Sequence, residues 1–272
     1  QARGAIWTAE LAAGVMQADA ELSADERLQH LLVTQYTDAL PPTHVHPEDA
    51  PPAWLTAEHP LPDNATPWAK ALAAGLKPGP HTAGPDDMAV MPYTSGTTGF
   101  PKGVIHTSGS LVAGVKGQLK FRHYFSDKDI AVNAAPANHF VYFLGMLSAI
   151  ASNSQAWLAG DTSARHVLEL IARERLSIVF SFPHTFINMQ ELGLDNYDLS
   201  SVRMWLSAAD SSHEAHIKEF TRHGALLRLF GRKLVGSMYV DSLGSSEVGF
   251  GAINRFCFSF SSKYDRYVGQ SS

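Results

Sequence analysis

The spacing of hydrophobic residues changes repeatedly between helical and strand-like patterns after residue 87. Apolar positions at helical spacing predict helices over 108–120, 141–150, 161–176 and 212–223, with Thr162 or Ser163 as the N-cap of the third. Short apolar runs predict strands over 88–93, 130–134, 155–158, 177–182, 202–207 and 234–240. Because strands that alternate with helices form mostly parallel sheets covered on both faces, the pattern indicates an α/β fold.

The first 87 residues have a different pattern. Leu28, Leu31, Leu32 and Tyr36 lie at helical spacing and predict an amphipathic helix over 24–36, with a change to strand near Leu31 as the alternative. Eleven of the 15 prolines fall in 41–85, which predicts an extended loop with one short helix at 68–76. We therefore expect an N-terminal subdomain with a proline-rich connecting loop over 1–87 and a core α/β subdomain over 88–272.

The amino-acid composition argues against several kinds of binding partner and metal site. Lys and Arg number 21 and Asp and Glu 26, so the net charge is −5, and the absence of a basic block argues against nucleic acid. The single Cys257 excludes an intramolecular disulfide and a multi-cysteine zinc site. The His44-x-His46 pair has no further ligand at metal-binding spacing, which favours a solvated loop.

The longest uncharged stretch covers residues 140–159 and is long enough to raise the question of a membrane span. It contains several Ser, Asn and Gln residues and lacks a basic N-terminal flank, so we expect a buried helix followed by a buried strand. No signal peptide is visible, and a cytoplasmic protein is the expectation.

The strongest candidate for chemistry is the loop at 93–103, Tyr-Thr-Ser-Gly-Thr-Thr-Gly-Phe-Pro-Lys-Gly. Its glycines allow positive φ and close backbone approach, so that successive N–H groups can form an anion-binding nest. Lys102 adds a positive charge suited to a polyphosphate, and neutral donors come from the hydroxyls of Thr94, Ser95, Thr97 and Thr98. It is not a Walker A loop, because Pro101 replaces the glycine that precedes the lysine in that motif.

Residues 93–104 resemble the phosphate-binding signature of the adenylate-forming enzymes, which include acyl- and aryl-CoA synthetases, luciferases and the adenylation domains of peptide synthetases. A second match, Ser242-Leu243-Gly244-Ser245-Ser246-Glu247, resembles their Tyr-Gly-x-Thr-Glu element. Gly244 and Glu247 match directly, Ser246 keeps the hydroxyl of the threonine, and Leu243 replaces the tyrosine that stacks on adenine. The form Leu-Gly-Ser-Ser-Glu is more similar to the CoA ligases than to amino-acid-activating domains.

Three weaker matches lie between these two in the expected order. Pro136-Ala137-Asn138-His139 resembles the family's Pro-x-x-His, whose histidine lies by the acyl pocket. Phe182-Pro183-His184 resembles a Val-Pro-Pro segment, and Ser207-Ala208-Ala209-Asp210 resembles a strand end that borders adenine and the acyl group.

The resemblance implies activation of a carboxylic acid by ATP and then transfer to coenzyme A. The implied phosphate- and nucleotide-binding residues are Thr94, Ser95, Gly96, Thr97, Thr98, Gly99, Lys102, Ser207, Ala208, Ala209, Leu243, Gly244, Ser245 and Ser246. Lys102, His139 and Glu247 are the implied catalytic residues, with Glu247 as the Mg²⁺ ligand. The implied acyl-pocket walls are Phe140, Phe143, Ala209, Met238 and Val248.

In the family a ribose-binding Thr-Gly-Asp element and a small C-terminal domain follow the region matched here. Only three residues follow Gly269, so we expect part of a large N-terminal domain without the small domain, inactive by itself. Three functional interpretations remain open: a CoA synthetase, a non-catalytic nucleotide-binding or interaction module, and an adenylation domain that serves a carrier protein or an amine.

Overall fold

The chain consists of two compact units in a computed structural model, Gln1–Thr82 and Ala83–Ser272. The sequence places the boundary a few residues later, at 87/88. The structure describes residues 2–38, 40, 50–51, 53–80, 82–94, 99–119, 128–208, 210, 212–249, 253–260 and 268–269. The His44-x-His46 pair lies outside the described residues.

The first unit is built on a small parallel sheet of strands β1 (Gly4–Thr8), β2 (His30–Thr34) and β3 (Thr66–Pro67). Its helices are α1 (Ala12–Ala20), α2 (Ala53–Thr56) and α3 (Trp68–Ala73), with two short 3-10 helices, Ala9–Leu11 and Tyr36–Asp38. Trp7, Ala9 and Val33 form its buried core. Helix α3 confirms the short helix predicted at 68–76.

The helix predicted over 24–36 is wrong, since β2 occupies the second half of that range. Val33 is only 1% exposed and lies opposite Trp7 in the parallel pair of β1 and β2. A β-branched side chain packs well on a sheet and loses rotamer freedom in a helix. The alternative, a change to strand near Leu31, is therefore the correct one.

The second unit contains a seven-stranded sheet in the order β16-β15-β14-β11-β10-β8-β9. The parallel strands are β8 (Ile130–Asn133), β9 (Gln155–Leu158), β10 (Ile178–Ser181), β11 (Met204–Ala208) and β14 (Met238–Leu243). Strands β15 (Ile253–Cys257) and β16 (Val268–Gly269) run antiparallel to their neighbours. The helices are α4 (Ser108–Leu119), α5 (Phe140–Ser152), α6 (Ala164–Glu174), α7 (Pro183–Glu191) and α8 (Glu214–Arg222). The predicted α/β class is confirmed, and Ser163 is the N-cap of α6.

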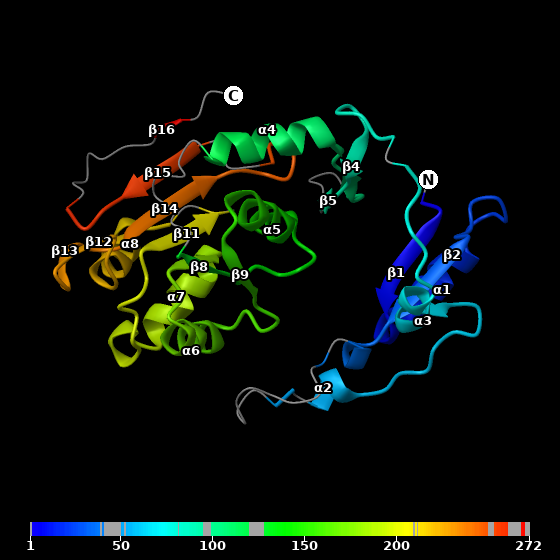
Figure 1. Ribbon diagram of the computed structural model, residues 1–272, viewed down its shortest axis with the longest axis horizontal. Coiled ribbons are helices and arrows are strands. Elements are labelled where there is room, and N and C mark those ends of the chain that lie inside the picture. Colours follow the sequence, from blue (N-terminus) through cyan, green and yellow to red (C-terminus); the bar gives the residue numbers. More distant parts are fainter. Residues whose placement is uncertain are drawn as a thin grey trace. The chain divides into compact units, whose positions relative to one another are not determined.

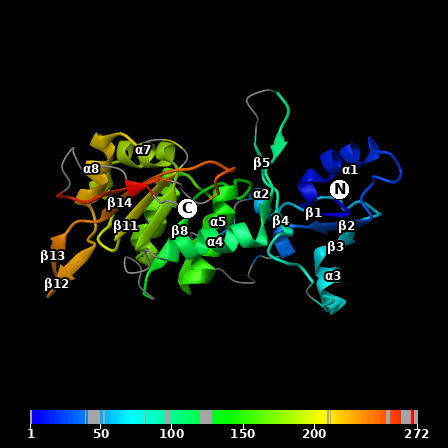
Figure 2. The ribbon, with the colours of Figure 1, turned by 90° about the horizontal axis from the view of Figure 1, so that it is seen from above.

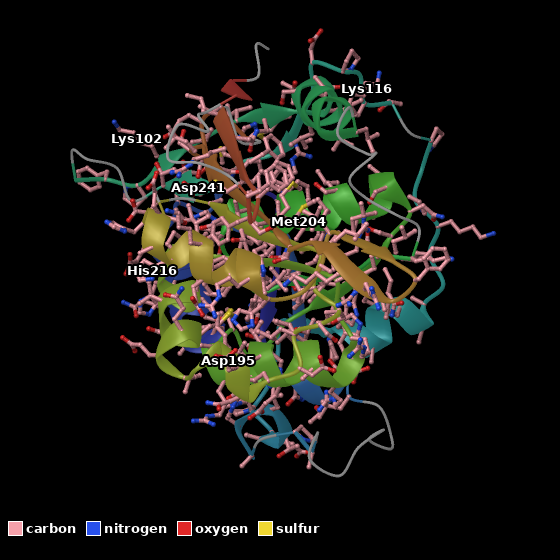
Figure 3. All side chains as sticks on the ribbon, turned by 90° about the vertical axis from the view of Figure 1, so that its left-hand side faces the viewer. Lys102, Lys116, Asp195, Met204, His216 and Asp241 are labelled. Carbon is pink, nitrogen blue, oxygen red and sulfur yellow. The ribbon has the colours of Figure 1, made fainter. Side chains whose placement is uncertain are left out.

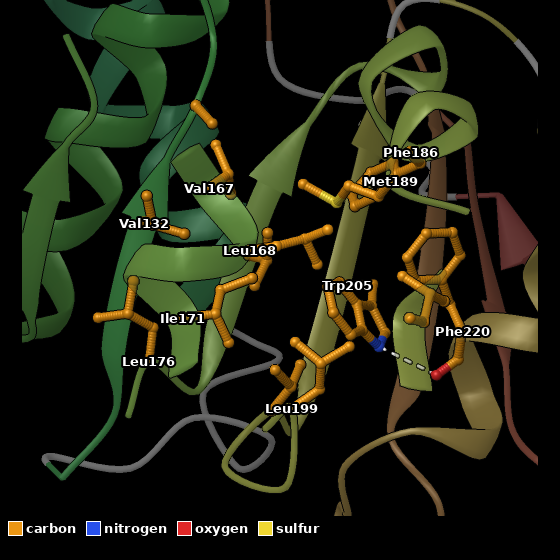
Figure 4. Close-up of a cluster of buried hydrophobic side chains, with 14 of the residues drawn as sticks. Val132, Val167, Leu168, Ile171, Leu176, Phe186, Met189, Leu199, Trp205 and Phe220 are labelled. Carbon is orange, nitrogen blue, oxygen red and sulfur yellow. Dashed lines mark hydrogen bonds between the residues drawn. The ribbon is translucent and has the colours of Figure 1, made fainter. Parts of the chain in front are cut away.

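Alternation along the strands separates two faces of this sheet. On one face Val132, Val179, Trp205 and Tyr239 pack in register against α6, α7 and α8 in the main hydrophobic core. Trp205 lies at its centre, with its ring 4.8 Å from that of Phe220 (Figure 4). On the other face Ala131, Ile178, Met204 and Val240 form a second cluster with Phe256.

Several predicted elements differ in detail. The run at 88–93 is not one buried strand but two short exposed ones, β4 (Met88–Val90) and β5 (Tyr93–Thr94), separated by Met91 and Pro92. Pro92 has no N–H for a ladder, and β4 and β5 pair instead with β7 (His106–Thr107) and β6 (Lys102–Gly103). Figure 2 labels β4 near one end of α4 and β5 above it.

The predicted strand at 234–240 is also divided. Its first part belongs to β13 (Arg232–Val235), which forms a hairpin with β12 (Leu227–Leu229), and its second part is β14. The break falls at Gly236, where an added Cβ would lie 2.1 Å from the Thr221 carbonyl oxygen. The apolar pattern of the sequence does not predict helix α7, which begins at Pro183.

The uncharged stretch at 140–159 contains a helix, α5, and a strand, β9, in the predicted order, but within α5 only Phe140 and Leu144 are buried. Strand β9 lies at the sheet edge, and Leu158 is 46% exposed, so the expectation of a buried strand is wrong there. Among the described residues, no helix combines the length and the apolar character needed to cross a membrane.

Candidate functional site

The candidate site segments converge at one edge of the main sheet. His139 follows β8, Ala208 ends β11, and Gly244 to Glu247 follow β14. The carboxyl ends of parallel strands share one edge, and ligands of open α/β sheets bind there, at the point where the strand order reverses. Strand β8 lies at this point, because β9 pairs on one of its sides and β10 on the other.

A cavity of about 400 Å³ lies between helices α4 and α5 and the second face of the sheet. Apolar side chains form most of its wall, among them Phe140, Leu144, Met204, Leu206, Val240 and Phe256. Five predicted site residues also line it: His139, Ala208, Gly244, Ser245 and Ser246. The cavity therefore joins an apolar chamber to the polar turn after β14.

His139 is the N-cap of α5. Its Nδ1 accepts a hydrogen bond from the Val141 amide at 3.2 Å, and its ring meets that of Phe182 edge-on at 5.1 Å. Partial burial lowers the pKa of His139 from its usual value. A neutral ring whose Nδ1 accepts carries its proton on Nε2, so His139 can donate from that atom to a ligand oxygen.

Lys102 lies at the base of the predicted phosphate loop. It is exposed in β6, directly opposite Thr94 of β5, so the loop connects the two strands of this antiparallel pair. Gly99 has φ of +112°, which favours glycine. Ser95, Gly96, Thr97 and Thr98 lie outside the described residues.

Glu247 occupies a tight turn in which the amides of Val248 and Gly249 donate to the Ser245 carbonyl oxygen at 3.1 and 3.0 Å. The pKa of its carboxyl lies below the usual value, chiefly because the Ser245 side chain hydrogen-bonds to it, then through its own backbone amide and the positive charge of Lys102. The Ser245 side chain therefore does most to keep Glu247 ionised, and the positive charge of Lys102 adds to this effect.

A buried polar network supports the end of β11. The Ser212 hydroxyl contacts the hydroxyls of Ser207 and Tyr239 at 3.2 and 2.9 Å, and the Ser212 amide donates to the Asp241 carboxylate at 3.3 Å. Burial raises the pKa of the Asp241 carboxyl above its usual value. Asp241 is labelled in Figure 3. Ser207 is fully buried within this network, so it supports the segment that Ala208 presents to the cavity.

Burial also raises the pKa of Tyr239 to about 12. The Tyr239 phenol has a pKa near 10 in the unfolded chain, so between pH 10 and 12 it ionises more readily there than in the folded protein. We therefore expect this group to lower the free energy of unfolding by up to about 3 kcal/mol over that range. Tyr239→Phe removes that contribution, so its pH–stability curve will be flatter in this window than that of the wild type. Chemical denaturation at pH 9, 10, 11 and 12 measures the difference, and parallel curves would contradict the assignment.

The other residues that the sequence predicts for the nucleotide site or the acyl pocket differ in how they are buried. Leu243 and Val248 are 56% and 55% exposed. Met238 is buried in the second cluster of the sheet, Phe143 packs beside Phe140, and of the wall residues that the sequence predicts and the structure describes only Phe140 lines the cavity. Ala209 lies outside the described residues.

Sequence reasoning missed several polar groups at the site. Asn133 and Asn254 line the cavity, and Asn254 Oδ1 accepts from the Ser242 hydroxyl at 2.5 Å. The Asn133 amide donates to the Tyr142 carbonyl at 3.0 Å and lies against Gly145, where an added Cβ would be 2.3 Å from Asn133 Nδ2. These residues stand outside the recognisable motifs, and only their strand positions could have indicated them.

Among the described residues, no group of three His, Cys, Asp or Glu side chains is arranged to hold a metal ion. Glu247 and the neighbouring Ser246 are nevertheless hard oxygen donors of the kind that Mg²⁺ prefers when substrate phosphates complete its shell. The residues present therefore fit a cation that arrives with a nucleotide better than a permanently bound metal.

Comparison with known proteins identifies relatives of the chain. The model of the AMP-binding enzyme family matches residues 7–239. A 3-aminoavenalumate diazotase from a Streptomyces species is 30% identical over 195 residues, which cover 70% of this chain and 35% of that protein. The 4-coumarate–CoA ligase 3 of Arabidopsis thaliana is 32% identical over 164 residues, 57% of this chain and 29% of the ligase.

Solved structures show the same fold. An anthranilate CoA ligase in complex with anthranoyl-AMP superposes with a TM-score of 0.68 at 18% identity, over 93% of this chain and 43% of that chain. The N-terminal domain of FACL13 from Mycobacterium tuberculosis gives 0.59 at 19% identity, over 91% of this chain and 52% of that one.

The chain spans about a third of the length of the curated relatives described above. The fold is that of N-terminal domains of adenylate-forming enzymes, and the matched family model covers most of the chain. The chain therefore belongs to the AMP-binding enzyme family of adenylate-forming enzymes.

Proposed function

We propose that the protein activates a carboxylic acid with ATP to an acyl adenylate and then transfers the acyl group to coenzyme A. The observation that carries the proposal is the apolar cavity that His139, Ala208 and the Gly244–Ser246 turn border at the carboxyl edge of the sheet. The positive charge of Lys102 suits a nucleotide polyphosphate and the ionised Glu247 the cation that accompanies it, while the cavity suits a bulky apolar acyl group.

In the first half-reaction a carboxylate oxygen attacks the α-phosphorus of ATP, and the bond to the pyrophosphate leaving group breaks. Lys102 and the hydroxyls of the 94–98 loop would bind the β- and γ-phosphates and stabilise the charge that develops on them. Glu247 and Ser246 would hold Mg²⁺, which supplies further neutralisation of phosphate charge. His139 would donate from Nε2 to the acid and orient it.

In the second half-reaction the coenzyme A thiolate attacks the acyl carbonyl carbon, and AMP leaves. His139, at the start of α5 and at the cavity wall, would remain beside the carbonyl in this step. Ala208 would border the adenine and the acyl group, on a segment that the buried Ser207, Ser212 and Tyr239 hold in place.

Exchange of labelled pyrophosphate into ATP tests the first half-reaction. We expect the natural protein that carries these residues to catalyse exchange only when a suitable acid is present, with aryl and larger aliphatic acids in the panel. The matched control omits the acid. Absence of exchange with every acid of a broad panel would refute the proposed enzymatic function.

The acceptor is tested separately, by following AMP release from the preformed acyl adenylate with coenzyme A, hydroxylamine or a phosphopantetheinylated carrier domain. We expect coenzyme A to accelerate release most. Preference for the carrier or for the amine would reassign the second step and leave the first intact.

A further inference from the structure

His106 is a buried histidine that the proposed chemistry does not use. It lies in β7, opposite Val90 of β4, and its side chain belongs to a residue only 6% exposed. It follows Lys102 by four positions, so the same short stretch of chain carries both residues. A buried imidazole needs partners for its ring nitrogens and ring faces, and the structure gives it two specific ones.

The first partner is the turn that carries Glu247. His106 Nε2 lies 2.6 Å from the carbonyl oxygen of Ser246. A carbonyl only accepts, so Nε2 carries the hydrogen and donates. Gly249, with φ of +80°, closes the turn against the ring, where an added Cβ would lie 3.5 Å from His106 Cε1. The imidazole therefore holds the backbone immediately before Glu247.

The second partner is Phe140. The two rings stack with centroids 4.4 Å apart and an angle of 15° between their planes. Phe140 is the first residue of α5, follows His139 and lines the cavity. An aromatic pair of this kind adds stabilisation beyond the area that it buries, so the stack fixes the wall of the cavity at its polar end.

We propose that His106 is a positioning residue that couples the nucleotide side of the site to the acyl side, through its hydrogen bond to Ser246 and its stack on Phe140. The inference rests on the proposed function. Its two contacts lie on different atoms of the ring, so different substitutions can remove them one at a time.

His106→Phe keeps the stack and removes the donor. We expect the KM for MgATP in pyrophosphate exchange to rise about tenfold, because the Ser246 carbonyl loses its partner, while the KM for the acid stays within about twofold. His106→Gln keeps an amide donor near Nε2 and removes the ring. We expect it to leave the KM for MgATP within about threefold and to raise the KM for the acid roughly fivefold.

Two further variants complete the experiment. Phe140→Leu removes the stack from its other side and should reproduce the acid effect with His106 intact, even where a His106 variant does not fold. His166→Phe, at a half-buried histidine of α6 outside all of the matched motifs, is the matched control and should change neither KM.

The outcomes separate the inference from the function on which it rests. A rise chiefly in the KM for MgATP with His106→Phe and chiefly in the KM for the acid with His106→Gln, with cooperative melting kept, supports the coupling role. Equal changes in both KM values, or no change in variants of an active protein, would overturn it. A wild-type protein with no exchange activity would refute the proposed function itself and the inference with it.

Discussion

Lys102→Ala will lower the rate of acid-dependent pyrophosphate exchange by about 100- to 1,000-fold, the usual effect of removing one preorganised group that stabilises transition-state charge. Lys102 is exposed and begins a two-residue strand, so its side chain contributes little to the fold. Glu247→Ala, in the exposed turn after β14, should depress exchange as well and raise the Mg²⁺ concentration needed for half-maximal rate. Exchange kinetics at several Mg²⁺ concentrations measure both effects.

Two controls make this prediction specific. Lys116→Ala removes an exposed lysine of α4, and Glu169→Ala removes an exposed glutamate of α6; both should retain wild-type exchange. Thermal melting of Lys102→Ala and Glu247→Ala should remain cooperative, with midpoints close to the wild type. Loss of cooperative melting in either variant would make that residue structural, and full activity would remove it from the site.

Trp205→Ala will lower the free energy of unfolding of the second unit by about 3–5 kcal/mol, the usual cost of deleting a fully buried large aromatic side chain. The side chain is 0% exposed and packs edge-on against Phe186 and Phe220 at 6.1 and 4.8 Å. Its Nε1 donates to the Phe220 carbonyl at 3.1 Å and to the Ser237 hydroxyl at 2.9 Å. Urea denaturation followed by circular dichroism measures the loss.

Trp205→Phe is the matched variant, since it keeps most of the ring packing and loses the donor. We expect it to cost about 1–2 kcal/mol, the range for leaving a buried acceptor with one partner fewer. A cost for Trp205→Ala within about 0.5 kcal/mol of the wild type would show that this region is not the stabilising core of the unit.

Long periodic segments allowed most of the second unit to be predicted. Helix α6 is strongly amphipathic, and Val167, Leu168 and Ile171 on its apolar face are fully buried. Both the helix and its N-cap are as predicted. The family resemblance of the motif pointed to Ser246 and Glu247, and the structure places both in the turn after β14. Local sequence suffices where one apolar face or one short motif determines the outcome.

The wrong predictions concern segments whose structure depends on contacts between residues far apart in the sequence. Strand β2 exists because Val33 packs against Trp7 of another strand, a pairing between residues 26 positions apart in the sequence that helical spacing cannot reveal. Pro92 divides the apolar run at 88–93 into two strands, β4 and β5, each of which pairs with a different strand. His106 was missed for the same reason, because its partners Ser246 and Phe140 come from remote parts of the chain.

The path of oxygen from the acid tests the central claim most directly. With an acid labelled by ¹⁸O at both carboxylate oxygens, attack on the α-phosphorus leaves one labelled oxygen on phosphorus after the acyl group departs. Mass spectrometry of the nucleotide product should therefore find AMP carrying one ¹⁸O, whichever acceptor takes the acyl group. Unlabelled AMP, or ADP together with labelled inorganic phosphate, would contradict adenylation at this site.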